Sequence, residues 1–469
     1  MPTYLGVDLG TSGLRGVLID ADLQVLARAA LPYPGAFTDS AAWLRGLERL
    51  AANLRTQHPR AWSALRAISL DGTSSTLLPC AEDGAALCPA LPYSDQRATL
   101  EARWLAEHWP TGGAALGTSS SLSKLLWLRQ HFPSFSQIKY IHHQADWVAA
   151  QLTGRFGISD RGNLLKIGLD AQQLSYPDAL FKVLGQAGID PLILPEAVRE
   201  GAAVGTVQTQ WTQQLHLPAR TEIRAGCTDS VAAALAAGLQ AVGQALTSLG
   251  STMAFKVVHP HPISGHGIYS HFLGDYCLVG AASNSGGAAL LRYLSAAQMA
   301  SLESTITPGR PSGQLIYPLP ARGERFPVNA PEWRGSILPD HQAAAIFQPL
   351  LEGLAYIEQW SYSILQAAGV MIDEPIRSVG GGARNLPWMQ LRANVLQKAV
   401  EIILENDAAM GSALLAASGD SDGIVAVSGS SHSNGRIFLP DPAARESYCF
   451  YGTRFRDRFS ALSRNHRPH

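Results

Sequence analysis

Residues 4–20, YLGVDLGTSGLRGVLID, place a short apolar run on each side of a turn, and Asp8 closes the first run. Four residues form the turn: Gly10, Thr11, Ser12 and Gly13. A third apolar run at 23–31 follows a second turn, so the opening of the chain predicts an antiparallel meander of strands. A dinucleotide-binding or P-loop motif would instead join a strand to a helix.

The glycine and hydroxyl residues of this turn are suited to binding an anion. Backbone amides around Gly13 and the hydroxyl groups of Thr11 and Ser12 can contact phosphate oxygens, and Asp8 can hold a magnesium ion, usually through water. An ordinary hairpin, in which Asp8 and Thr11 only satisfy turn amides, explains the segment equally well.

The same pattern returns in GQALTSLGSTMAFKVV, residues 243–258. Three residues separate its two apolar runs: Gly250, Ser251 and Thr252. Two hydroxyl-bearing hairpins favour a clamp for the phosphate chain of a nucleotide. The repetition predicts one α/β fold used twice, with domains at 1–238 and 239–469.

Length and composition agree with two domains and exclude several classes of protein. The chain has 469 residues, beyond the size at which a single core stops growing. Its net charge of −1 argues against a nucleic-acid partner. We find no leader or long apolar segment, and the five scattered cysteines lack a CxxC spacing. We therefore expect a cytoplasmic protein without membrane partners, whose cysteines are reduced core thiols.

Further segments follow the same alternation of strands, glycine turns and helices. Residues 40–57 have helical periodicity, and the apolar run at 65–72 leads into Thr73 and Ser74. Residues 376–400 read as a strand, a triple glycine and a helix with Pro387 in its first turn.

Asp229 lies in AGCTDSVAAALAAG, residues 225–238, where a glycine turn precedes an alanine-rich helix. Considered in isolation, an aspartate in such a position most often belongs to a helix cap. The helix dipole favours its charged form and lowers its pKa, which makes the carboxylate a weak base.

Together these segments closely resemble, in the right order, the FGGY family of carbohydrate kinases. The resemblance covers nearly the whole chain and implies two actin-like (ribonuclease H-like) ATPase domains with a central cleft. It assigns the sugar site and the catalytic base to the N-terminal domain and nucleotide binding to the C-terminal domain.

The resemblance implies that Asp229 takes the proton from a sugar hydroxyl group as that group attacks the γ-phosphate of ATP. Phosphoryl transfer has a loose transition state, so a weak base that mainly orients the hydroxyl group suffices. The two hairpins then become phosphate segments, with Mg²⁺ at Asp8. The adenosine segment contains Gly381, Gly382 and Asn385, and we assign to Gly411 only the close packing of a helix.

Sugar recognition requires hydroxyl and charged groups that pair with the hydroxyl groups of the substrate. The candidates are Thr73, Ser74, Asp95, Arg97 and Ser230. The alternatives are ordinary serines at a strand end and a local ion pair. Many xylulokinases carry Met-His where this chain has Thr73-Ser74, and Trp where it has Tyr93, which favours D-ribulose over D-xylulose.

We therefore expect an ATP- and Mg²⁺-dependent kinase, monomeric or homodimeric, that converts D-ribulose to D-ribulose 5-phosphate. One alternative is a xylulokinase or a kinase of a related polyol. A second alternative is an actin-like ATPase or regulatory protein that transfers no phosphate to a sugar, because the fold alone does not decide function.

Three segments have no assigned chemistry. Residues 311–335 are rich in proline and glycine and are expected at the surface, and the Ser/Gly-rich stretch 418–435 is expected to be mobile or divergent. Four histidines cluster between 259 and 271 without a cysteine or carboxylate at ligand spacing, which favours a solvated loop over a metal site. They are His259, His261, His266 and His271.

Overall fold

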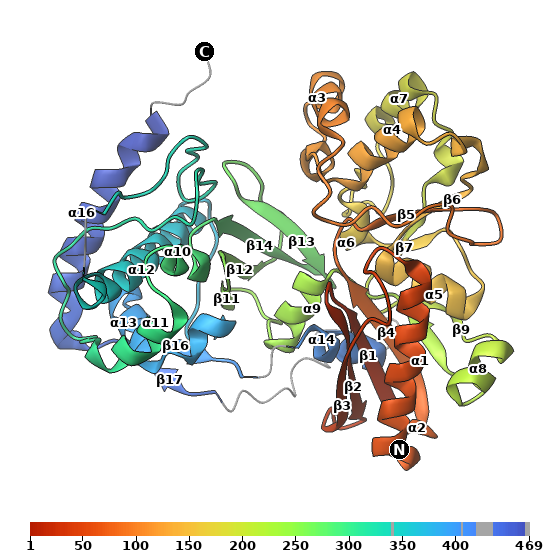
Figure 1. Ribbon diagram of the computed structural model, residues 1–469, viewed down its shortest axis with the longest axis horizontal. Coiled ribbons are helices and arrows are strands. Elements are labelled where there is room, and N and C mark those ends of the chain that lie inside the picture. The colour runs from red at the N-terminus through yellow and green to blue at the C-terminus, as the bar shows by residue number, and fades with distance from the viewer. Residues whose placement is uncertain (339–341, 405–406, 419–434, 465–469) are drawn as a thin grey trace. The chain divides into compact units, whose positions relative to one another are not determined.

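The computed structural model describes residues 1–338, 342–404, 407–418 and 435–464 (Figure 1). By their internal contacts they form two compact units. The first unit contains Met1–Gly238, Phe272–Gly274 and the described residues from Asp407 to Ser418, which include helix α14 (Ala408–Ala417), and the second contains the other described residues. The division at residues 238 and 239 remains our proposal for the domain boundary.

The sheet of the first unit has the strand order β3-β2-β1-β4-β10-β9. Strands β1, β2 and β3 pair antiparallel, which confirms the predicted meander, while β4 is parallel to both β1 and β10. The strands are β1 Thr3–Leu9, β2 Gly13–Asp20, β3 Val25–Pro32, β4 Leu65–Gly72, β9 Ala203–Thr206 and β10 Glu222–Arg224.

The sheet of the second unit has the order β13-β14-β12-β11-β15-β16-β17. Strand β12 pairs antiparallel with β11 and β14, and β15 is parallel to both β11 and β16. This is the pairing scheme of the first sheet, so the predicted repetition is confirmed. The strands are β11 Ala245–Leu249, β12 Met253–His259, β13 Tyr269–Leu273, β14 Tyr276–Ser283, β15 Ile376–Val379, β16 Val400–Ile402 and β17 Ile437–Phe438.

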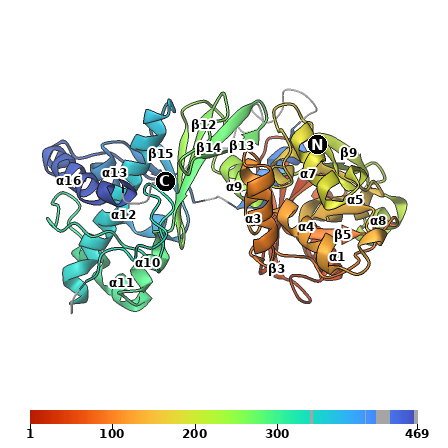
Figure 2. The same cartoon turned by 90° about the horizontal axis from the view of Figure 1, so that it is seen from above.

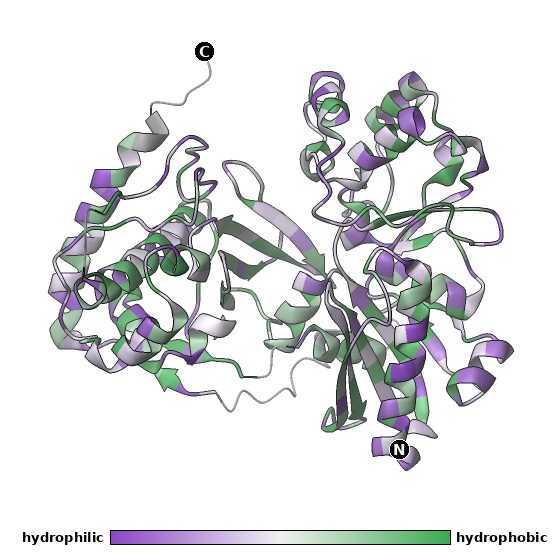
Figure 3. Cartoon of the chain, in the orientation of Figure 1, coloured by the Kyte–Doolittle hydropathy of each residue, from purple (hydrophilic) through white to green (hydrophobic). Residues whose placement is uncertain are grey.

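Helix α1 (Ser40–Gln57) has the predicted bounds for reasons that are local in the sequence. Asp39 caps it by accepting a hydrogen bond from the Ala41 amide at 3.0 Å, and its apolar positions recur with helical spacing. Trp43, Leu47 and Leu54 on this face are buried. Figure 3 shows the result as alternating hydrophilic and hydrophobic bands along α1 beside a mainly hydrophobic sheet.

Further helices and two small sheets complete the first unit. The helices are α2 Pro59–Trp62, α3 Thr99–His108, α4 Ser121–His131, α5 Gln144–Thr153, α6 Arg161–Leu164, α7 Asp178–Ala187, α8 Thr209–Leu215 and α9 Asp229–Ala236. The small sheets pair β5 Leu77–Cys80 with β6 Tyr140–His143 and β7 Ile158–Asp160 with β8 Glu196–Val198.

Helix α14 packs in the first unit although it lies late in the chain. A Cβ atom on Gly411 would lie 1.9 Å from the Ala232 carbonyl oxygen of α9, so only glycine allows this approach. The packing role predicted for Gly411 is confirmed. On β1, a Cβ atom on Gly6 would lie 1.9 Å from the Ala409 carbonyl oxygen.

Helices α12 (Ala343–Ala367), α13 (Leu386–Leu396) and α16 (Arg445–Arg464) lie on one side of the β12–β14 strands in the second unit (Figure 2). Two shorter helices, α10 (Gly287–Leu291) and α11 (Ala296–Leu302), follow β14. As predicted, Pro387 stands in the first turn of α13. Asn385 caps that helix by accepting from the Trp388 amide at 2.8 Å.

The expectation that residues 311–335 lie at the surface is wrong for much of the segment. Tyr317, Phe326 and Val328 are at most 1% exposed, and the Tyr317 ring stacks on that of Phe455 in α16 at 5.6 Å. Proline and glycine prevent regular pairing here without preventing burial. Isolated bonds satisfy backbone groups instead, such as that from the Glu324 amide to the Ala330 carbonyl group at 3.0 Å.

Other composition-based expectations have mixed outcomes. Cys80, Cys227 and Cys277 are buried thiols, whereas Cys88 is half-buried and Cys449 is exposed, so these last two are not core thiols. Among the helices that the structure describes, none combines the length and the apolar character needed to cross a membrane. Most of the Ser/Gly-rich stretch, residues 419–434, lies outside the described residues.

Candidate functional site

Three aspartates gather at the carboxyl ends of adjacent parallel strands in the first unit. Asp8 on β1 is in register with Asp71 on β4, and a parallel bridge between Gly72 and Thr228 brings the start of α9 beside the end of β4. Asp229 is the first residue of that helix. The carboxyl ends of parallel strands are where α/β sheets bind their ligands.

Asp8 and Asp71 form a buried acidic pair. Burial raises the pKa of Asp8, and Arg15, whose Nη1 lies 2.6 Å from Asp8 Oδ2, acts in the opposite direction. Burial, followed by the charge of Asp8, raises the pKa of Asp71 well above its usual value. Ser412 of α14 donates a hydrogen bond to Asp71 Oδ2 at 2.6 Å. Both carboxyl groups therefore have raised pKa values, and the pKa of Asp71, which is paired with a hydroxyl group rather than a cation, is raised well above its usual value.

Asp71 was absent from the predicted site, although the sequence contains a signal for it. Asp71-Gly72-Thr73-Ser74 repeats the order of carboxylate, glycine and hydroxyl groups that begins at Asp8. Applying the reasoning used for Asp8 to this second segment would have identified Asp71.

Asp229 occupies the predicted position at the start of a helix, with Thr228 as the N-cap residue. The Asp229 side chain is half-buried, and its Oδ1 accepts a hydrogen bond from the Ser230 amide at 2.6 Å. Burial lowers the pKa of Lys166, and the charge of Asp229 partly opposes this effect. The charge of Asp229 also contributes to the raised pKa of Asp71, so Asp229 interacts electrostatically with both Asp71 and Lys166.

The turn between β1 and β2 presents both predicted hydroxyl residues, because Thr11 and Ser12 are exposed. Glycine at position 13 is also required for a structural reason that is independent of phosphate binding. A Cβ atom there would lie 2.2 Å from the Leu31 carbonyl oxygen, so strand β3 requires glycine at this position whether or not a phosphate binds nearby.

The predicted sugar residues Thr73 and Ser74 differ in availability. The Thr73 hydroxyl group is paired inside the protein, with Thr76 Oγ1 at 2.6 Å and Gln144 Oε1 at 3.1 Å. Ser74 Oγ is buried and has no hydrogen-bond partner among the described residues. Unpaired buried hydroxyl groups are rare, so Ser74 Oγ is the better candidate for contact with a ligand.

Ser230, Asp95 and Arg97 already have partners within the first unit. Ser230 Oγ lies 3.5 Å from Thr228 Oγ1. Asp95 and Arg97 form the local ion pair considered as an alternative, with Arg97 Nη2 2.8 Å from Asp95 Oδ2. Burial opposes ionisation of Asp95, but the hydrogen bonds from Arg97 prevail and lower its pKa. Their contact with a sugar remains a prediction.

Lys124 on α4 forms hydrogen bonds to the main chain of two of the predicted sugar segments. Its Nζ atom donates to the main-chain oxygens of Ser75 at 2.8 Å and Pro92 at 2.7 Å, and the side chain is fully buried. Ser75 has a positive φ of 72°, which is unfavourable for a residue with a side chain. Lys124 therefore helps to hold the backbone on which Ser74 lies.

The ammonium group of Lys124 predicts a pH dependence of stability. Burial lowers its pKa to about 7, although Asp95 raises it, and Lys166 and Arg97 lower it further. The unfolded chain keeps this proton up to its ordinary pKa of 10.5, so folding releases a proton between these values and stability rises with pH. We therefore compare the free energies of unfolding of the wild type and of Lys124→Met. The wild-type value minus the Lys124→Met value should increase by about 1.4 kcal/mol per pH unit in this window.

Urea unfolding of both proteins at pH 7, 8 and 9 measures this difference. Asp95, Arg97 and Lys166 are present in both proteins and cancel in the comparison. A difference that stays constant over the three pH values would contradict the assignment of the lowered pKa to Lys124.

A largely apolar cavity of about 580 Å³ lies in the second unit. Its wall includes predicted nucleotide-binding residues, namely Gly250, Ser251, Gly381, Gly382 and Asn385, but Thr252 is not part of it. Trp388, Phe347 and Met299 line the same space, and Glu303 adds a carboxylate. Glycines beside apolar and aromatic side chains are suited to enclosing a flat ring. The sequence patterns did not identify Trp388 or Glu303.

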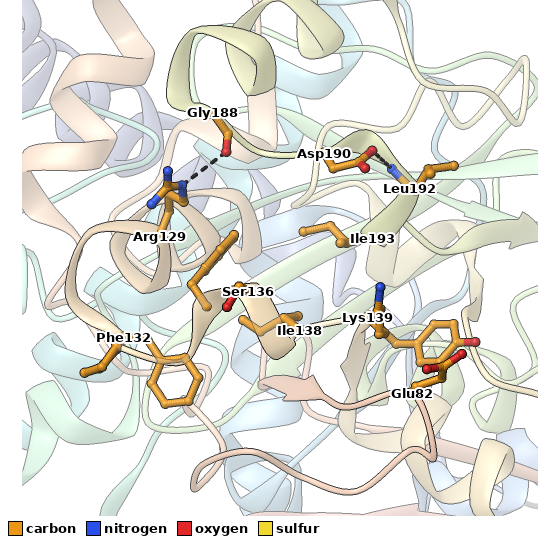
Figure 4. A pocket seen from close by; sticks show the side chains of 13 residues that line it. Glu82, Arg129, Phe132, Ser136, Ile138, Lys139, Gly188, Asp190, Leu192 and Ile193 are labelled. Carbon is orange, nitrogen blue, oxygen red and sulfur yellow. Dashed lines mark hydrogen bonds between the residues drawn. The ribbon is translucent and has the colours of Figure 1, made fainter.

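A different groove, of about 800 Å³, lies in the first unit and contains none of the predicted site residues (Figure 4). Arg129 donates from Nε to the Gly188 carbonyl group at 3.1 Å on one side, and Asp190 accepts from the Leu192 amide at 3.0 Å on the other. These bonds are local, and we assign the groove no role.

Within the described part of the chain, no group of three metal-ligating side chains comes together. His261 and His266 of the histidine cluster are exposed, and His259 Nδ1 bonds to the main chain of His261. A magnesium ion at Asp8 stays a prediction, and in the structure Asp8 is buried and its Oδ2 is paired with Arg15.

Comparison with known proteins gives matches over most of the chain. The model of the FGGY family of carbohydrate kinases, N-terminal domain, matches residues 3–236, and that of the C-terminal domain matches residues 245–419. A xylulose kinase from Lactococcus lactis is 25% identical over 94% of this chain and 93% of its own.

Two crystal structures show the same fold. The first, described as a xyloylose kinase from Brucella ovis, has a TM-score of 0.86 and 24% identity, covering 98% of this chain and 99% of its own. The second, a xylulose kinase from Rhodospirillum rubrum, has a TM-score of 0.85 with the same identity and coverage. The predicted class of two α/β domains of this family is thereby confirmed.

Proposed function

The chain belongs to the FGGY family of carbohydrate kinases, and from this membership we propose that it transfers the γ-phosphate of ATP to a terminal hydroxyl group of a ketopentose. The observation that carries the proposal is in the first unit. Asp229 starts α9 beside the end of β4, the strand that carries Asp71, and the next turn bears the unpaired hydroxyl group of Ser74.

In this proposal Asp229 aligns the attacking hydroxyl group and accepts its proton. The start of a helix favours the ionised carboxylate, which is the form that accepts a hydrogen bond. A weak base is sufficient because bond cleavage to the leaving oxygen is advanced in phosphoryl transfer before much proton transfer is required. Ser74 Oγ would pair with another hydroxyl group of the sugar.

The second unit would bind the nucleotide in its cavity of about 580 Å³. Glycines at 381 and 382 let the backbone approach a flat base, and Asn385 keeps its amide NH₂ available because its oxygen caps α13. Thr11, Ser12 and the turn at 250–252 supply hydroxyl groups and amides for phosphate oxygens. A magnesium ion at Asp8, once bound, would neutralise phosphate charge.

The identity of the ketopentose is the finer part of the proposal. Thr73-Ser74 in place of Met-His, and Tyr93 in place of Trp, favour conversion of D-ribulose to D-ribulose 5-phosphate. The relatives named xylulose kinase favour D-xylulose as the alternative, and a related polyol remains a third choice. A cytoplasmic location and a monomeric or homodimeric state stay predictions.

A substrate panel tests both the proposed kinase activity and the proposed choice of D-ribulose. We expect ADP release from ATP and Mg²⁺ to be stimulated by ketopentoses, with the highest kcat/KM for D-ribulose, followed by D-xylulose. L-ribulose, ribitol and glycerol complete the panel. A higher kcat/KM for D-xylulose would reject the D-ribulose assignment alone, and stimulation by none of the five compounds would reject the kinase proposal in favour of an ATPase without sugar transfer.

A further inference from the structure

We propose that Glu324 is a positioning residue for the nucleotide cavity of the second unit. Through Ser283 and Asn284 it holds the segment that continues into residues 286–288, which line the cavity, against the turn at 250–252. The inference rests on the proposed function, because it takes a nucleotide as the occupant of the cavity. It assigns a role to the segment 311–335, which the sequence patterns had placed at the surface.

Glu324 is a buried carboxylate that receives several hydrogen bonds. Glu324 is only 2% exposed, and the donors are hydroxyl groups and main-chain amides. The short bonds come from Ser283 Oγ at 2.7 Å, Asn284 N at 2.8 Å, Tyr317 OH at 2.9 Å and Arg325 N at 2.9 Å, and a longer one comes from Phe326 N at 3.4 Å. Ser285 Oγ lies 3.3 Å from Glu324 but donates its hydrogen bond to the Pro318 carbonyl group at 2.5 Å. The two shortest bonds to Glu324 come from Ser283 and Asn284.

Residues 285–288 in turn bond directly to the turn predicted to bind phosphate. The Gly287 amide donates to the Gly250 carbonyl group at 2.8 Å, and the Ala288 amide donates to the Ser251 carbonyl group at 3.1 Å. At the start of β12, the Met253 amide donates to the Ser285 carbonyl group at 2.7 Å. The segment that donates hydrogen bonds to Glu324 is therefore bonded, a few residues further on, to the backbone of the second hairpin.

Both segments form the wall of the cavity. Gly286, Gly287 and Ala288 line it together with Gly250 and Ser251. Their fit is close, because a Cβ atom on Gly286 would lie 2.6 Å from the Ser251 carbonyl oxygen. A displacement of residues 283–287 would consequently change the position of the backbone that lines the cavity.

The second unit supplies a matched control for the loss of a buried carboxylate. Glu352 on α12 is also fully buried and accepts from Ser312 Oγ at 2.5 Å, the Ser312 amide at 2.8 Å and Gln348 Nε2 at 2.9 Å. Neither Glu352 nor its partners line the cavity. Glu352→Gln therefore removes the same kind of group without touching residues 283–287.

Calorimetric titration with ADP tests the inference in the wild type, Glu324→Gln and Glu352→Gln. We expect the Kd of ADP to rise about tenfold in Glu324→Gln, the effect of losing charge-assisted hydrogen bonds, and to stay within about twofold in Glu352→Gln. The KM of the ketopentose should be unchanged in both. An unchanged Kd in Glu324→Gln, or an equal increase in both variants, would overturn the inference.

Ser283→Ala gives a milder test should Glu324→Gln fail to fold. It removes one donor to Glu324 and should raise the Kd of ADP about threefold, and the two changes combined should cost less than the product of their separate effects. An unchanged Kd in Ser283→Ala would contradict the inference. Wild-type protein that binds no ADP would overturn the proposed function and this inference with it, whereas the outcomes above reject the role of Glu324 alone.

Discussion

Replacing Asp229 with asparagine is expected to lower kcat for sugar phosphorylation by about 10²- to 10⁴-fold, the usual range for the loss of a general base. The Kd of ADP should stay within about twofold, because the cavity that we propose for the nucleotide is lined by residues of the second unit. Steady-state kinetics and calorimetric titration of the same preparation measure the two quantities.

Asparagine is an informative replacement because it separates catalysis from the local structural role of Asp229. It keeps the shape of the side chain and an oxygen that can accept from the Ser230 amide, so a purely structural Asp229 would tolerate it. Asp22→Asn, in the exposed turn between β2 and β3, is the matched control and should leave both quantities unchanged. If Asp229→Asn retained more than a tenth of the wild-type kcat, Asp229 would not be the base.

Replacing Glu358 with alanine is expected to lower the free energy of unfolding by about 3–5 kcal/mol, because the substitution leaves a buried guanidinium group unpaired. Glu358 and Arg392 are both fully buried and form two bonds, of 2.6 Å and 2.7 Å. Thr247 of β11 donates to Glu358 at 2.6 Å, and Arg392 donates to Ser378 of β15 at 2.8 Å. The pair thus links the two strands that lead to Gly250 and Gly380.

Urea unfolding measures this loss, and Arg66→Ala provides the contrast. Arg66 pairs with Glu222 at 2.9 Å, but its side chain is 52% exposed. Loss of such an exposed pair should cost at most about 1 kcal/mol. A similar loss in both variants would show that burial does not give the Glu358–Arg392 pair its importance.

Features that depend on neighbouring residues could be predicted from the sequence. The hairpins at 4–20 and 243–258 and helix α1 follow from alternation, periodicity and turn residues within a few positions of one another. The position of Asp229 at the start of α9 follows in the same way. The repeated glycine and hydroxyl pattern also identified Gly250 and Ser251, which line the cavity.

Features that depend on distant residues could not be predicted in this way. Ser412 donates to Asp71 across 341 positions, and no local pattern connects them. Glu324 lies in a segment whose proline and glycine content indicates the surface, yet folding buries it against residues 283–285. Its donors become apparent only when the chain is folded.

The most direct test of the proposed transfer is to identify the products that the wild-type protein forms from ATP, Mg²⁺ and D-ribulose, using ³¹P NMR and mass spectrometry. We predict ADP and an equal amount of a pentulose phosphate ester on the terminal carbon. ADP accompanied by an equal amount of inorganic phosphate, with the sugar unchanged here and with D-xylulose, would contradict the account.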